Sequence, residues 1–171
     1  MTDATRGGSG RGFFEEIGLH VPGFKGYLRK ELRRDADKAQ REFLVGELKK
    51  LKGRVDVVKR DLAVAGKLSA LTRLESVTDK FSTIITRVGA ADYGYSGFFD
   101  ANQVDETRLD LLYQVDMALI EEAKAVETAV GPISADQEES DLLATLRAIE
   151  DKIVHFGTQF DKRRQILKGE M

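Results

Sequence analysis

Residues 44–65 of this chain read LVGELKKLKGRVDVVKRDLAVA, and their regular apolar spacing predicts the architecture of the whole chain. Its apolar residues recur in alternating steps of four and three, and most residues between them are charged. The seam consists of Leu44, Leu48, Leu51, Val55, Val58, Leu62 and Ala65. Such a/d spacing, held for three heptads, predicts an amphipathic helix with one apolar stripe to cover. Because no proline interrupts residues 24–65, we expect one very long first helix over that range.

Three further helices are expected to cover that stripe. They span about 69–89, 105–130 and 135–168, and each carries its own apolar stripe at helical spacing. Strand-like alternation is not found along the chain. The predicted fold is therefore all-α: an elongated antiparallel four-helix bundle or coiled coil over 24–169, preceded by a flexible Gly/Arg-rich tail and lead-in over 1–23.

A second apolar stripe precedes the seam and does not keep its phase. It consists of Leu28, Leu32, Ala36, Ala39 and Phe43. The step from Ala39 to Leu44 is five, so the apolar face shifts near Phe43, which indicates a handover between packing partners. We expect the first helix to pack on the fourth before Phe43 and on the second beyond it. Leu28, Leu32 and Ala36 would then lie near Phe160 and Leu167.

Asp116 occupies a seam position of the third helix, where a buried and unpaired charge costs several kcal/mol. Two arrangements remain open. In one, Val115 rotates inward and Asp116 stays at the edge of the core. In the other, Asp116 pairs with a basic residue of another helix, with Arg73 or Arg87 as the candidates.

The composition bounds the class of protein. The chain contains no cysteine, which excludes disulfides and thiolate metal sites. It contains no apolar run near eighteen residues and no apolar core in its first residues, so neither a transmembrane helix nor a signal peptide is expected. We expect a cytoplasmic protein, with peripheral contact at the inner face of the membrane as an open alternative.

Side-chain patterns for catalysis or metal binding are missing. The only histidines are His20 and His155, and neither follows a glutamate by three residues, as di-iron bundles require. Asp151 and His155 are spaced as i and i+4, which indicates a surface pair rather than a metal site. Nucleophile motifs and phosphate-binding glycine loops are also missing. We therefore expect no enzyme, no metal and no cofactor.

An aromatic loop is the most distinctive local feature. Residues 90–103 form a long predicted loop in which aromatic residues alternate with glycine. The aromatic residues are Tyr93, Tyr95, Phe98 and Phe99. Two interpretations stay open: an aromatic plug that closes the short end of the bundle, or a surface that binds a partner or ligand.

The charges are unevenly distributed along the chain, although the net charge is only −2. Residues 25–60 carry thirteen Lys and Arg against six Asp and Glu, whereas residues 104–151 carry three against thirteen. Basic pairs without interleaved aromatics, in a slightly acidic chain, do not indicate a nucleic-acid partner.

A basic cluster is predicted at one end of the bundle if the fourth helix runs antiparallel beside the first. Its members are Arg29, Lys30, Arg33, Arg34, Lys162, Arg163, Arg164 and Lys168. Such a cluster favours binding to an anionic surface, and membrane phospholipid is the first choice. The alternative is that these side chains extend into solvent and keep the protein soluble.

Four segments resemble a family of uncharacterised bacterial helical proteins. They read VPGFKGY at 21–27, RRDAD at 33–37, DYGYSGFFDA at 92–101 and LYQVD at 112–116. The family is encoded near membrane-stress genes of the phage-shock-protein-A and stomatin/band-seven kinds. The resemblance implies no catalytic residues.

Two functions are consistent with these patterns. The first is a non-enzymatic helical scaffold or adaptor, with a protein partner or self-association, acting at the cytoplasmic membrane surface in envelope stress. The second is a soluble ligand-binding or regulatory bundle that uses residues 90–103.

Overall fold

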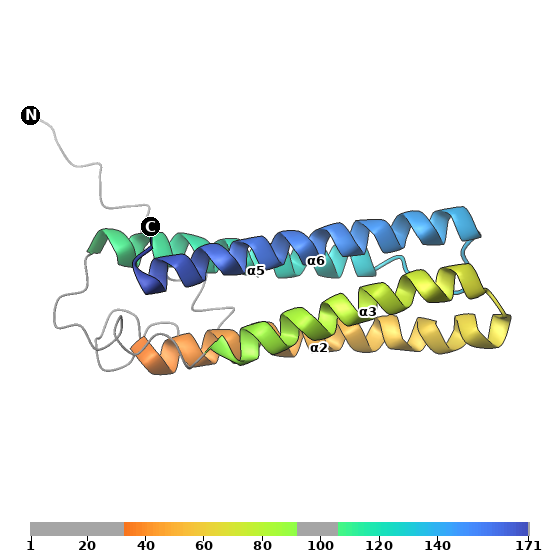
Figure 1. The fold of residues 1–171 in the computed structure, drawn as a ribbon, viewed down its shortest axis with the longest axis horizontal. Helices are drawn as coiled ribbons and strands as arrows, with labels where there is room; N and C mark the ends of the chain where they lie inside the picture. Colours follow the sequence, from red (N-terminus) through yellow and green to blue (C-terminus); the bar gives the residue numbers. More distant parts are fainter. Residues whose placement is uncertain (1–32, 92–105, 171) are drawn as a thin grey trace, which may run out of the picture.

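Four long helices make up the described part of the chain (Figure 1). The computed structural model describes residues 33–91 and 106–170. The helices are α2 (Arg33–Ala65), α3 (Leu68–Gly89), α5 (Glu106–Val130) and α6 (Glu139–Lys168). Within these two ranges no strand occurs, so the predicted all-α class and helical bundle are confirmed. The predicted extension of the first helix back to residue 24 lies outside the described residues.

The helices form two hairpins that lie side by side. α2 and α3 run in opposite directions, and so do α5 and α6 (Figure 1). Ion pairs between α3 and α6 advance in the same direction along both helices, from Arg73–Glu150 to Arg87–Asp161. These two neighbours are therefore parallel, as are α2 and α5. Neighbouring helices are antiparallel within a hairpin and parallel between hairpins, whereas the sequence suggested an antiparallel bundle.

This order of packing puts α6 diagonally opposite α2. α6 packs beside α3 and α5, and α2 packs beside the same two helices on the other side. The expected side-by-side packing of α6 on the start of α2 is therefore wrong for the described residues. The two helices instead meet across the bundle through an ion pair between Arg163 and Asp37. Leu28 and Leu32, which were expected at this contact, lie outside the described residues.

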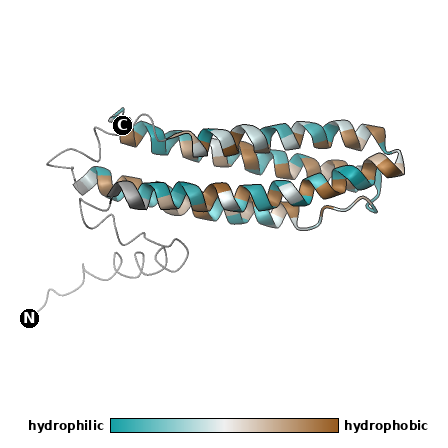
Figure 2. Ribbon diagram, turned by 90° about the horizontal axis from the view of Figure 1, so that it is seen from below, coloured by the Kyte–Doolittle hydropathy of each residue, from teal (hydrophilic) through white to brown (hydrophobic). Residues whose placement is uncertain are grey.

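The predicted seam of α2 lies in the core. All of its members are buried except Ala65, which is exposed beside the turn to α3. The other three helices bury matching stripes. These include Leu74, Phe81, Val88, Leu112, Leu119, Val126, Leu142, Phe156 and Phe160. Figure 2 shows hydrophobic and hydrophilic residues alternating along each helix, as amphipathic packing requires. Of the described helices, none combines the length and hydropathy needed to cross a bilayer.

The buried face of α2 does not shift near Phe43. Asp37, Gln40 and Arg41 are buried and continue the four-three spacing backward from Leu44, while Phe43 is only half-buried. For the described side chains, from Asp37 onward, the predicted handover is therefore wrong. The inward positions before Leu44 are polar, so a search for apolar residues followed the neighbouring stripe instead.

Candidate functional site

Two groups of predicted site residues lie outside the described ranges. One is the aromatic loop with Tyr93, Tyr95, Phe98 and Phe99, and the other is the pair Arg29 and Lys30. Arg33 and Arg34 begin α2. The proposed roles of these residues stay predictions.

The α6 members of the predicted basic cluster do not stay together. Lys162, Arg164 and Lys168 are exposed near the end of α6. Arg164 Nη2 lies 3.8 Å from Asp161 Oδ1, and Lys168 Nζ lies 3.9 Å from Glu170 Oε1. Arg163 is only 1% exposed, so its predicted place on a surface for anions is wrong. Because it lies at an inward position of α6, Arg163 binds carboxylates inside the bundle.

Arg163 is the centre of a buried ion network that joins three helices. Its Nη2 donates to Asp37 Oδ1 of α2 at 2.6 Å, and its Nε donates to Asp116 Oδ1 of α5 at 2.6 Å. Nη2 also lies 3.4 Å from Gln40 Oε1. Asp37 accepts a second hydrogen bond, at 3.0 Å, from Arg41 Nε one turn further along α2. The charges alternate in sign from Arg41 to Asp116, so the network is neutral as a whole.

Asp116 is the least well paired member of this network. Its side chain is fully buried, and its Oδ2 accepts no hydrogen bond from the described residues. Burial raises the pKa of the Asp116 carboxyl above its ordinary value of 3.8, although the Arg163 charge and the Gln40 amide act in the opposite direction. Of the two arrangements left open by the sequence, the buried pair is correct. The partner is Arg163, since Arg73 pairs with Glu150 and Arg87 with Asp161.

Sequence reasoning missed the network, although a signal was present. Arg163 lies three residues after Phe160 and four before Leu167, which is the seam spacing of α6. Asp37 and Arg41 continue the seam of α2 in the same way. A charged residue at a seam position on each of several helices predicts a buried network. With two strong charge-assisted hydrogen bonds, this network holds three helices together and resembles a structural element more than a reactive one.

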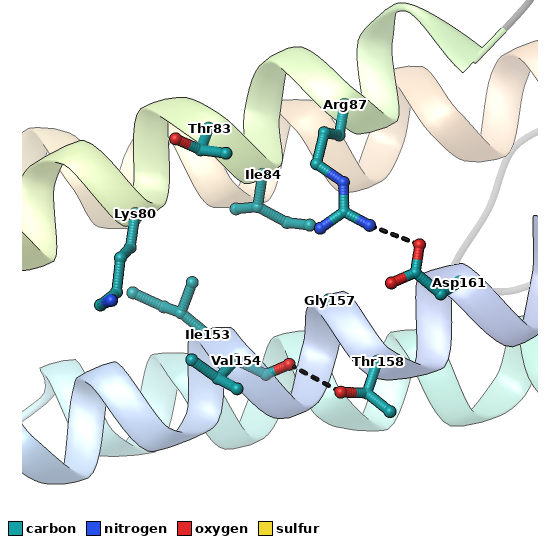
Figure 3. A pocket seen from close by; sticks show the side chains of 9 residues that line it. All are labelled: Lys80, Thr83, Ile84, Arg87, Ile153, Val154, Gly157, Thr158 and Asp161. Atoms are coloured by element: carbon teal, nitrogen blue, oxygen red, sulfur yellow. Dashed lines mark hydrogen bonds and ion pairs between the residues drawn. The ribbon is translucent and has the colours of Figure 1, made fainter.

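A groove lies between α3 and α6 (Figure 3). Its volume is about 470 Å³. It is lined by Lys80, Thr83, Ile84 and Arg87 of α3 and by Ile153, Val154, Gly157, Thr158 and Asp161 of α6. Ile84 and Ile153 are almost fully buried and form its apolar floor, while Val154 stays 55% exposed at its edge. We call this hollow the α3–α6 groove.

Gly157 keeps the α3–α6 groove open on its α6 side. A Cβ at this position would lie 3.5 Å from Arg87 Nη1 and 3.7 Å from Ile84 Cδ1. The groove is bounded by two ion pairs that join its walls, Arg87 with Asp161 and Lys80 with Glu150. Lys80 and Arg87 are seven residues apart, so the two ion pairs are separated by about 10 Å along α3, or two helical turns.

A smaller hollow lies between the other parallel pair, α2 and α5. Its volume is about 330 Å³, and Phe43, Leu51 and Ile120 contribute to its lining. Both hollows therefore lie where one hairpin meets the other. Among the described residues, no group of three or more metal-ligating side chains is found. His155 Nδ1 lies 3.3 Å from Glu122 Oε2 of α5. The expected pair of His155 with Asp151 is therefore replaced by a pair between two helices.

No family model, no curated protein and no solved structure matches this chain. The resemblance to helical proteins of membrane-stress neighbourhoods therefore remains an expectation.

Proposed function

We propose that this chain is a non-enzymatic helical adaptor that holds an amphipathic helix of a partner protein in the α3–α6 groove. The observation that carries this proposal is the groove itself, in which Ile84 and Ile153 lie between two ion pairs separated by about two helical turns. Amphipathic helices bind such grooves through apolar residues at i, i+3, i+4 and i+7. The resemblance described above supports envelope stress as the setting of this adaptor.

The charges at the rim favour an acidic partner helix. Lys80 and Arg87 both belong to the α3 wall and are partly exposed. Each has more hydrogen-bond donors than one carboxylate uses, so Glu150 and Asp161 leave room for a further acceptor. A partner helix with acidic residues beside its apolar stripe would place them against this wall.

The test uses two synthetic peptides of about 15 residues, a length at which helices form with partial stability. Both carry the same leucine stripe, and one is flanked by Glu while the other is flanked by Lys. We expect the Glu-flanked peptide to shift the backbone amide NMR signals of Thr83, Gly157 and Thr158, and the Lys-flanked peptide to bind more weakly.

Two valine variants provide the matched control for this titration. Val154→Glu places a charge at the edge of the groove and should weaken binding of the Glu-flanked peptide. Val57→Glu changes another exposed valine, on α2 and outside the groove, and should leave binding unchanged. Absence of any shift at the groove with both peptides would remove the proposed function.

Binding to an anionic membrane surface is a second candidate. Lys162, Arg164 and Lys168 are exposed at the end of α6, which supports it. With Arg163 buried and carboxylates near Arg164 and Lys168, the available charge is smaller than the sequence suggested. Co-sedimentation with vesicles of phosphatidylserine and phosphatidylcholine tests it. Binding that persists in Lys162→Glu/Arg164→Glu/Lys168→Glu, or that does not weaken as the salt concentration rises, would argue against a role for these residues.

A further inference from the structure

The turn between α2 and α3 presents an apolar knob to solvent. Val64 is 91% exposed and Leu68 is 70% exposed, more than any other large apolar side chain of the described residues. Ala65 between them is exposed as well. Backbone hydrogen bonds around Gly66, which has a φ of +70°, hold these residues in a tight turn. We call residues 64–68 the hairpin tip.

The one basic residue of the hairpin tip is directed inward. Lys67 Nζ donates to the backbone carbonyls of Ala135 at 2.7 Å and Gln137 at 3.0 Å, in the connection between α5 and α6. The carboxylates of Asp61, Glu138 and Glu139 flank the tip, and all three residues are exposed. Glu139 is joined to the tip region through a hydrogen bond from Ser69 Oγ. Arg60, one turn before Val64, is exposed as well, so three acidic side chains and one basic side chain lie beside this apolar tip.

These properties complement those of the α3–α6 groove, which combines an apolar floor with Lys80 and Arg87 on its α3 wall. We infer that the hairpin tip of a second copy of this chain docks in the α3–α6 groove. The inference rests on the proposed function, because it names the partner of the same groove. Val64 and Leu68 would pack mainly against Val154, which is 55% exposed, above the buried Ile84 and Ile153. The flanking carboxylates would approach the basic wall.

The geometry of one molecule requires a second copy for this contact. The tip lies at one end of the bundle, whereas the groove residues from Lys80 to Arg87 lie in the second half of α3, away from it (Figure 1). A molecule therefore cannot fill its own groove, and each added copy leaves one tip and one groove unoccupied. Heterologous contacts of this kind produce a ring of copies when the rotation between copies closes, and an open chain when it does not.

Sedimentation velocity of the full chain, at about 10 µM to 1 mM, tests the inference in the range expected for such a small contact. We expect the average mass of the wild type to rise with concentration without reaching a dimer plateau. Leu68→Asp, with an altered tip, and Val154→Glu, with an altered groove, should each stay monomeric. Val57→Asp changes a valine two turns before Val64 and should assemble like the wild type.

Mixing the two assembly-deficient variants gives the sharpest result. Leu68→Asp retains an intact groove and Val154→Glu retains an intact tip, so their mixture should form a species of two copies and nothing larger. Both substitutions are at exposed positions, and circular dichroism checks that the helices persist. A wild type that stays monomeric throughout, or a mixture that does not pair, overturns the inference. If the Glu-flanked peptide still binds, the proposed function stands without it, and if the peptide also fails, both are wrong.

Discussion

Replacing Arg163 by methionine tests the buried network most directly. The substitution keeps a long side chain in the core but removes the guanidinium whose Nε donates to Asp116 Oδ1 at 2.6 Å. Asp37 retains its ion pair with Arg41, so the uncompensated charge is that of Asp116. Breaking a buried ion pair on one side generally costs about 3 to 5 kcal/mol.

Protonation of Asp116 sets an upper limit on this loss. The carboxyl can avoid the buried charge by taking a proton, and each pH unit between its ordinary pKa of 3.8 and pH 7 is worth about 1.4 kcal/mol. The part of the loss at pH 7 that comes from the Asp116 charge therefore cannot greatly exceed about 4 kcal/mol. For a chain of this length, a loss of about 4 kcal/mol corresponds to a fall in the melting temperature of roughly 10 °C.

The pH dependence gives the prediction its sign. Without Arg163, burial raises the pKa of Asp116 in the folded state further above its unfolded value. The folded state then holds a proton that the unfolded state has released, so stability falls as pH rises from 3.8 through the folded pKa. We expect urea unfolding of Arg163→Met to show the full deficit at pH 7 and most of it to disappear near pH 4.

Two controls complete this experiment. Arg164→Met changes the neighbouring exposed arginine and should unfold like the wild type at both pH values. Arg163→Met/Asp116→Leu removes both charges and should recover most of the lost stability, since apolar replacement of a buried pair is often neutral. The reasoning is refuted if Arg163→Met has the same free energy of unfolding as Arg164→Met, or if its loss of stability is equal at pH 7 and pH 4. It is also refuted if Arg163→Met/Asp116→Leu is no more stable than Arg163→Met.

Three further substitutions have outcomes that thermal or urea unfolding can check. In Gly66→Ala the added Cβ would lie within 4 Å of no other atom, but the φ of +70° at this position disfavours any residue with a side chain. We expect a loss of about 1 kcal/mol, and an unchanged stability would contradict the left-handed turn. Gly53→Ala, also without a neighbour but in the middle of α2, should stabilise by about 0.5 to 1 kcal/mol. Lys67→Met removes the hydrogen bonds to the carbonyls of Ala135 and Gln137 and should cost about 1 to 3 kcal/mol, with faster hydrogen exchange in that connection.

The core of the bundle could be predicted from the sequence because apolar spacing reports burial directly. Leu44 to Leu62 follow the seam without exception, and the stripes of α3, α5 and α6 are equally regular. The order of helices around the bundle was not predictable in the same way. An apolar stripe shows that a helix face is covered, but it does not distinguish a neighbouring helix from a diagonal one.

The buried polar residues exposed a different limit. Asp37 and Arg163 are 126 residues apart, and each alone resembles a solvated charge on a helix surface. Their burial depends on a partner that only the folded arrangement supplies. The α3–α6 groove was missed for a related reason, since it arises where two hairpins meet and leaves no pattern within either one.

The separation of these partners along the chain also has a consequence for the rates of folding and unfolding. Each hairpin forms from residues close in sequence, whereas the link from Asp37 to Arg163 closes a loop through nearly the whole bundle. Interactions that form after the folding transition state mainly slow unfolding. Arg163→Met should therefore leave the refolding rate almost unchanged and shorten the lifetime of the folded bundle, so that the network acts chiefly as a kinetic barrier to opening.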